Sequence, residues 1–175
     1  IGNKSRVANA AVNIGVLYDG IKKTDSALVY FKKATGLYNE LEDKEGLASC
    51  WKNIANTYLH EGRLSEAEKA ALSSLEVGRQ TGVPELVKGA SESLYNVYKQ
   101  QKQTNKALSM YELFIQMKDS IQSEKTKKES IRSQFRFEYD LKAVSDSLEF
   151  VIIKETKDLK IKVQDQAPRR APAPP

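Results

Sequence analysis

The stretch WKNIANTYLHEGRLSEAEKAA, residues 51–71, indicates the fold of this chain because its pattern returns at an interval of 40 residues. Three tyrosines share that interval, namely Tyr18, Tyr58 and Tyr98. A large aliphatic residue stands four positions before each tyrosine and an alanine nine positions after it; these are Ile14, Ile54 and Leu94, and Ala27, Ala67 and Ala107. A chain that repeats itself at a period of roughly 20 to 50 residues is expected to fold as a stack of similar units.

Apolar residues within each period recur at steps of three and four, the spacing of one face of an α-helix. In the first unit they are Val7, Ala11, Ile14, Leu17 and Tyr18, then Ala27, Leu28, Phe31, Ala34, Leu37 and Leu41. The last helix of the third unit is expected to turn inward Ala107, Leu108, Tyr111, Phe114 and Ile115. We therefore predict an all-α solenoid of antiparallel helix pairs over residues 1–118, with three units at about 5–41, 44–81 and 84–118.

The spacing Trp51-x2-Ile54-Ala55-x2-Tyr58, followed by Gly62 and Ala67, resembles the tetratricopeptide repeat. The other units show it as Ile14-Gly15-x2-Tyr18 with Ala27, Phe31 and Ala34, and as Leu94, Tyr98, Ala107 and Tyr111. The period of 40 and the lack of a closing proline are similar to the longer-repeat branch of that family. The resemblance implies a right-handed superhelix whose first helices line a concave side, and a scaffold for protein–protein interaction.

Residues 119–165 follow the repeats, because Glu138 stands where a fourth tyrosine would fall. The last pair of a solenoid exposes an apolar face, so we expect a capping helix that begins between Asp119 and Lys127. Its candidate capping residues are Ile121, Ile131, Phe135, Tyr139 and Leu141. A heptad-like seam of Leu141, Val144, Leu148 and Val151 extends it. This seam favours helix pairing, within the chain or as a homodimer.

Two further stretches are read from composition. Residues 150–164 fit either an extended helix or a hairpin that turns at 156–158, and we favour the helix. Residues 166–175 are rich in proline and alanine and are predicted to be an extended or disordered tail. Because the chain begins at Ile1 rather than Met, we expect it to be a piece of a longer protein.

The composition offers little for catalysis. His60 is the only histidine, which excludes a site built on a histidine pair, and Cys50 has no second cysteine and is expected to be a buried inert thiol. The sequence has no glycine-rich phosphate loop. Basic and acidic residues are interleaved, with a net charge of +5, and no apolar run reaches membrane-spanning length. We therefore predict no enzyme activity, no cofactor or metal, and no contact with nucleic acid or membrane.

The predicted concave side carries the candidate binding residues. They are Asn13, Lys52, Asn53, Asn56, His60, Glu92, Asn96 and Lys99. Asparagine offers donors and an acceptor to the backbone of an extended peptide, and lysine can hold a carboxylate, although polar residues there could also simply face water. Lys52, Asn56 and Asn96 resemble the first three positions of the carboxylate clamp of chaperone-binding family members. A strict step of 40 puts Arg132 and Arg136 in the last two, where the repeat register breaks.

The segments at 118–121 and 134–139 are similar to the region ahead of the membrane helix in bacterial tetratricopeptide-containing sensor histidine kinases and related regulators. That resemblance implies a sensory or signal-relaying role on the periplasmic side of a membrane; otherwise the chain would be cytoplasmic. The alternative function is a structural module that dimerises through its C-terminal helix.

Overall fold

A computed structural model describes the backbone of residues 2–166 and the side chains of residues 2–158 and 160. It contains six helices and, over residues 2–166, no strand. They are α1 (Gly2–Gly20), α2 (Thr24–Glu40), α3 (Lys44–His60), α4 (Leu64–Thr81), α5 (Pro84–Gln100) and α6 (Thr104–Gln166). Residues 150–164 are therefore helical rather than a hairpin. The predicted tail lies outside the described residues, apart from Gln166 at the end of α6.

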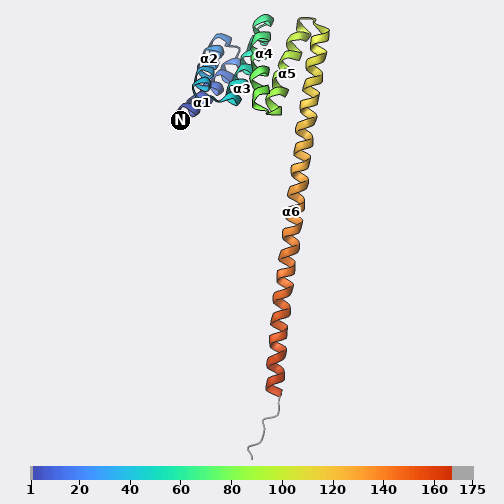
Figure 1. Ribbon diagram of the computed structural model, residues 1–175. Helices are drawn as coiled ribbons and strands as arrows, with labels where there is room; N and C mark the ends of the chain where they lie inside the picture. The colour runs from blue at the N-terminus through green and yellow to red at the C-terminus, as the bar shows by residue number, and fades with distance from the viewer. Residues whose placement is uncertain (1, 167–175) are drawn as a thin grey trace, which may run out of the picture. The chain divides into compact units, whose positions relative to one another are not determined.

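The first compact unit, residues 1–124, is a stack of antiparallel helices (Figure 1). Each helix from α1 to α4 packs against the next one along the chain. The first helices of successive pairs also touch, α1 against α3 and α3 against α5. This is the pattern of a helical solenoid, and the predicted all-α fold is confirmed.

Small residues allow the helices of a pair to approach closely. Ala27 and Ala67, one period apart, are both completely buried. A Cβ atom added to Gly15 would lie 2.6 Å from Cε1 of Phe31, closer than carbon atoms can pack. The Phe31 ring therefore occupies the space that Gly15 leaves open, and α1 and α2 are locked in register at this position.

Every junction between helices turns through one residue with a left-handed backbone. These residues are spaced 20 apart: Lys22 (φ 58°), Glu42 (φ 54°), Gly62 (φ 72°), Gly82 (φ 70°) and Lys102 (φ 60°). At four of the junctions the following N–H donates to a tyrosine carbonyl five residues earlier, at 2.9 Å. These tyrosines are Tyr18, Tyr38, Tyr58 and Tyr98. Such a bond closes the Schellman motif, which satisfies carbonyls left unpaired at a helix end. Turns within a repeat and turns between repeats therefore use the same capping motif.

The outward face of α1 departs from the prediction. Ile14 and Leu17 were expected to face inward, yet they are 36% and 70% exposed, whereas Ile54 and Leu94 are buried. The reason is position in the stack, because α3 and α5 pack against a preceding helix pair and α1 has no such neighbour among the described helices.

The predicted start of the capping helix is wrong, because no new helix begins between Asp119 and Lys127. Helix α6 runs without interruption from Thr104 to Gln166, a stretch with neither glycine nor proline to end it. Within the first unit its inward face is formed by Ala107, Met110, Leu113 and Met117. Leu108 and Tyr111, which were predicted to face inward, are exposed.

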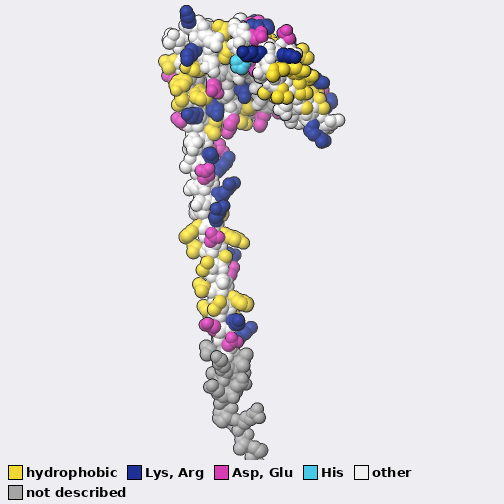
Figure 2. All heavy atoms as spheres, turned by 180° about the vertical axis from the view of Figure 1, so that it is seen from behind, with side chains coloured by type: hydrophobic (Ala, Val, Ile, Leu, Met, Phe, Trp, Pro, Cys, Tyr) yellow, Lys and Arg dark blue, Asp and Glu magenta, His cyan; other side chains and the backbone are white. Residues whose placement is uncertain are grey.

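The second unit, residues 125–175, contains the remainder of α6. Every described side chain of this part is exposed, and many of them are large and apolar (Figure 2). They include the proposed capping residues Ile131, Phe135, Tyr139 and Leu141, and the rest of the heptad-like seam, Val144, Leu148 and Val151. None of the described helices holds a stretch long and apolar enough to cross a membrane.

Two buried threonines give a matched test of the packing. The Thr57 hydroxyl is fully buried and has no hydrogen-bond partner among the described residues, whereas the Thr35 hydroxyl donates to the Lys32 carbonyl at 2.8 Å. Replacing Thr57 with Val removes an unsatisfied group and is expected to raise the free energy of unfolding by about 1 kcal/mol. Thr35→Val should lower it by about 1 kcal/mol, since it removes a formed bond. Chemical denaturation measures both, and equal effects of the two changes would contradict the assignment.

Candidate functional site

The C-terminal ends of α3 and α5 enclose a hollow of about 630 Å³ that brings together three of the predicted binding residues. His60 comes from α3, and Asn96 and Lys99 come from α5. All three side chains are exposed. The hollow therefore presents an amide, an imidazole and an ammonium group to solvent from two neighbouring repeats.

A second hollow, of about 680 Å³, lies between α1 and the starts of α3 and α5. Asn13 lines it together with Asn9 and Val12 of α1, Ser49 of α3 and Glu85 of α5. The first helices of all three repeats thus contribute to the lining of this hollow. Asn13 and the His60 group nevertheless lie in different hollows.

The other predicted residues line neither hollow. Asn56 is half-buried, and its Oδ1 accepts a hydrogen bond from the Ser93 hydroxyl at 2.8 Å. Lys52 lies across α5, since a Cβ atom on Gly89 would be 3.0 Å from the lysine Cδ. Asn53 is half-buried and Glu92 is exposed. The residues that resemble a carboxylate clamp are accordingly divided, with Lys52 and Asn56 joining α3 to α5 and only Asn96 exposed.

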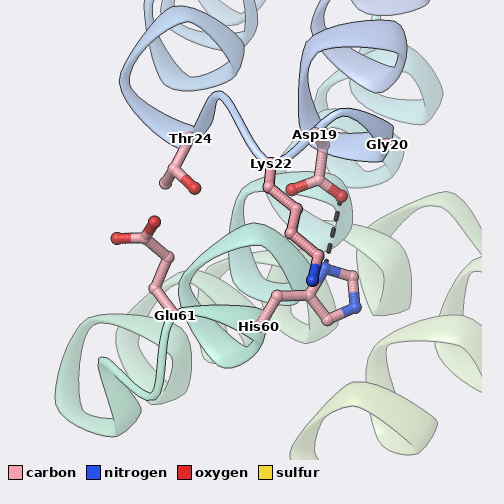
Figure 3. A pocket seen from close by; sticks show the side chains of 6 residues that line it. All are labelled: Asp19, Gly20, Lys22, Thr24, His60 and Glu61. Carbon is pink, nitrogen blue, oxygen red and sulfur yellow. Dashed lines mark ion pairs between the residues drawn. The ribbon is translucent and has the colours of Figure 1, made fainter.

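A third hollow, of about 490 Å³, joins the end of α1 to the end of α3 (Figure 3). Asp19, Lys22, His60 and Glu61 line it, and Nδ1 of His60 lies 3.3 Å from Oδ2 of Asp19. His60 lines both this hollow and the one with Asn96. Sequence reasoning missed Lys22 and Glu61. These two lie at helix ends, where the helical period gives no signal.

No group of three histidine, cysteine, aspartate or glutamate side chains converges on a potential metal position in the part of the chain that is described. Cys50 is completely buried, and its thiol donates to the Phe31 carbonyl at 3.3 Å. Burial raises the pKa of this thiol to about 12, so that it stays protonated and unreactive. Burial also raises the pKa of Tyr38 and Tyr98.

The geometry of the first unit defines a class of protein, one built of helical repeats with a polar face. The tetratricopeptide repeat family matches residues 6–80 of the chain. Such repeats generally mediate protein–protein interaction. The crystal structure of BtubC (BKLC) from P. vanneervenii has a similar fold, with a TM-score of 0.61 and 19% sequence identity. The similarity covers 69% of this chain and 51% of BtubC, about half of its length. No curated protein matches the sequence.

The buried thiol predicts a dependence of stability on alkaline pH. The unfolded chain releases the Cys50 proton near the ordinary pKa of 9.0, whereas the folded chain holds it to about 12. Stability from this group is therefore complete below pH 9 and is lost as the pH rises toward 12, by up to about 1.4 kcal/mol per pH unit. Denaturation curves between these limits should fall less steeply for Cys50→Ala. Parallel curves for the two proteins would show that the thiol is not held protonated.

Proposed function

We propose that the chain binds an extended peptide or protein segment along the face lined by α1, α3 and α5. The observation that carries this proposal is the hollow in which His60, Asn96 and Lys99 meet. Their side chains are exposed and come from two repeats, so a bound segment would touch both. The Asn96 amide can donate to and accept from a peptide backbone, and Lys99 can pair with a carboxylate.

The charges along this face suggest an orientation for the segment. Asp19 and Glu61 contribute carboxylates to the hollow between α1 and α3, while Lys99 contributes a cation beyond His60. Lys22 offsets part of the negative charge. We infer that the preferred segment has a basic residue directed toward α1 and an acidic residue or a terminal carboxylate directed toward α5, since opposite charges across an interface fix register.

The proposed binding face is tested with a peptide that is first selected, from a library of randomised sequences, for binding to the intact chain. We call the double variant described next the groove variant. Asn96→Ala combined with Lys99→Glu should weaken the selected peptide about tenfold, the change expected from loss of roughly 1.4 kcal/mol of polar contact. Calorimetric titration gives the dissociation constant. The melting temperature should hold, because both side chains are exposed.

Lys33→Glu on α2 is the matched control, because it makes the same charge change at another exposed lysine. It should leave the affinity of the selected peptide unchanged. Equal weakening by Lys33→Glu and by the groove variant would mean that net charge alone governs binding, and an unaffected groove variant would move the interface elsewhere.

A second candidate function is dimerisation through the part of α6 that lies in the second unit. The seam of Leu141, Val144, Leu148 and Val151 is exposed along that helix, and exposed apolar patches commonly mark interaction sites. The signalling role and periplasmic location that the kinase resemblance implies stay predictions.

The mass in solution separates the two candidates. If α6 dimerises the protein, light scattering should give twice the chain mass, and truncation after Gln122 or the double change Leu141→Asp and Leu148→Asp should restore the monomer. If the groove is the only interaction surface, all three proteins should be monomeric. A dimer that survives truncation would place the contact in the first unit.

A further inference from the structure

The third repeat carries an exposed aromatic edge in addition to the polar face. Tyr95 and Tyr98 of α5 and Leu108 and Tyr111 of α6 line a pocket of about 360 Å³, and we name these four residues the third-repeat edge. Leu108 is 56% exposed and Tyr111 is 45% exposed. All four belong to the first unit.

The first two repeats show what covers the corresponding surface. Phe31 and Ala71 precede Tyr111 by two periods and one period, and both are buried. Helix α3 packs against α2, where the Cys50 thiol reaches the Phe31 carbonyl. Helix α5 likewise packs against α4. In both cases the occupant is an α-helix. Over residues 2–124 no helix takes that place on the third repeat, because α6 continues without a turn.

The third-repeat edge differs from its counterparts in the size of its side chains. The paired positions are Gly15 with Phe31 in the first repeat, Ala55 with Ala71 in the second, and Tyr95 with Tyr111 in the third. The Tyr95 and Tyr111 rings lie 5.3 Å apart between centroids, at 44°. The third repeat thus has two large rings where the other repeats have at least one small residue, and these rings wall a hollow suited to an inserted apolar side chain.

The rim of this pocket is basic. Lys99 and Lys102 line it, and Nζ of Lys106 lies 5.1 Å from the centre of the Tyr98 ring. The nearby Glu68 carboxylate already accepts a hydrogen bond from Gln101 at 2.9 Å and lies 4.0 Å from Lys106. The lysines at the mouth are exposed, so an incoming acidic residue can reach them.

We propose that the third-repeat edge binds an amphipathic helix of a partner protein, with apolar residues at three- and four-residue spacing and acidic residues beside them. The helical form follows from the occupants of the two equivalent surfaces, and the acidic flank follows from Lys99 and Lys102. This site shares Lys99 with the polar face lined by α1, α3 and α5, but its apolar lining is its own, and the proposal stands whether or not a peptide binds that face.

The probe is a designed helical peptide of about the length of α5, which has 17 residues, with leucine on one stripe and glutamate on both flanks. It is compared on the intact chain with a peptide that has lysine in place of glutamate and with one that has alanine in place of leucine. Fluorescence anisotropy should show binding of the leucine–glutamate peptide, at least about tenfold tighter than of either variant.

Leu108→Glu should weaken that peptide by about tenfold or more, because it places a carboxylate in the apolar pocket and beside the acidic flank. Lys102→Asn, which tolerates the left-handed backbone there, should reduce the preference for glutamate over lysine. Val29→Glu on α2 is the matched control, since Val29 is 65% exposed and lies outside the edge. The variant Asn96→Ala, which alters only the polar face, should bind the helical peptide normally.

Absence of binding by the leucine–glutamate peptide would overturn the proposal. So would equal binding of all three peptides, or an affinity that Leu108→Glu leaves unchanged. Because Leu108 is more than half exposed, the melting temperature of Leu108→Glu should stay near that of the parent chain. That measurement separates a lost site from a lost fold.

Discussion

The close approach of helices at small residues is the constraint on which the structure of the first unit depends. Ala27 and Ala67 are fully buried where the helices of their pairs meet, and Gly15 leaves room for the Phe31 ring. Dispersion contacts are strong only at short range, so the pairs can stack densely only where a side chain is absent or minimal. These small residues thereby set how closely the two helices of a pair approach.

The same constraint explains why the third repeat has an aromatic edge. In the first two repeats at least one partner of each pair is small, and a following helix seals the contact. In the third repeat both partners are tyrosines, and their rings lie tilted against each other while that of Tyr111 stays partly in solvent. The polar face and the aromatic edge therefore offer two chemically different surfaces on one scaffold. An extended polar segment suits the first, and a helix suits the second.

The sequence was sufficient for the helix pairs because their pattern is local and repeated three times. The sequence was not sufficient to predict which residues are buried at the ends of the stack. Ile14 and Leu108 have the apolar character of core residues, but no neighbour among the described helices covers them. The sequence also could not separate Asn56 from Asn96, since these occupy the same register and differ only because Ser93 lies beside one of them. The continuity of α6 could have been predicted, because residues 104–166 contain neither glycine nor proline. The prediction of a turn after residue 118 instead followed the period of the repeats.

The left-handed residues fall at positions 22, 42, 62, 82 and 102, so the geometric unit of the chain is one helix and its turn, half of the sequence period. Because consecutive helices alternate in direction, inserting a single such unit would exchange the helices that line the polar face with those on the opposite side. Inserting two would lengthen the face and preserve its chemistry. A gene for such a chain can therefore grow by duplicating pairs without loss of its binding surface, whereas an odd duplication would turn that surface inside out.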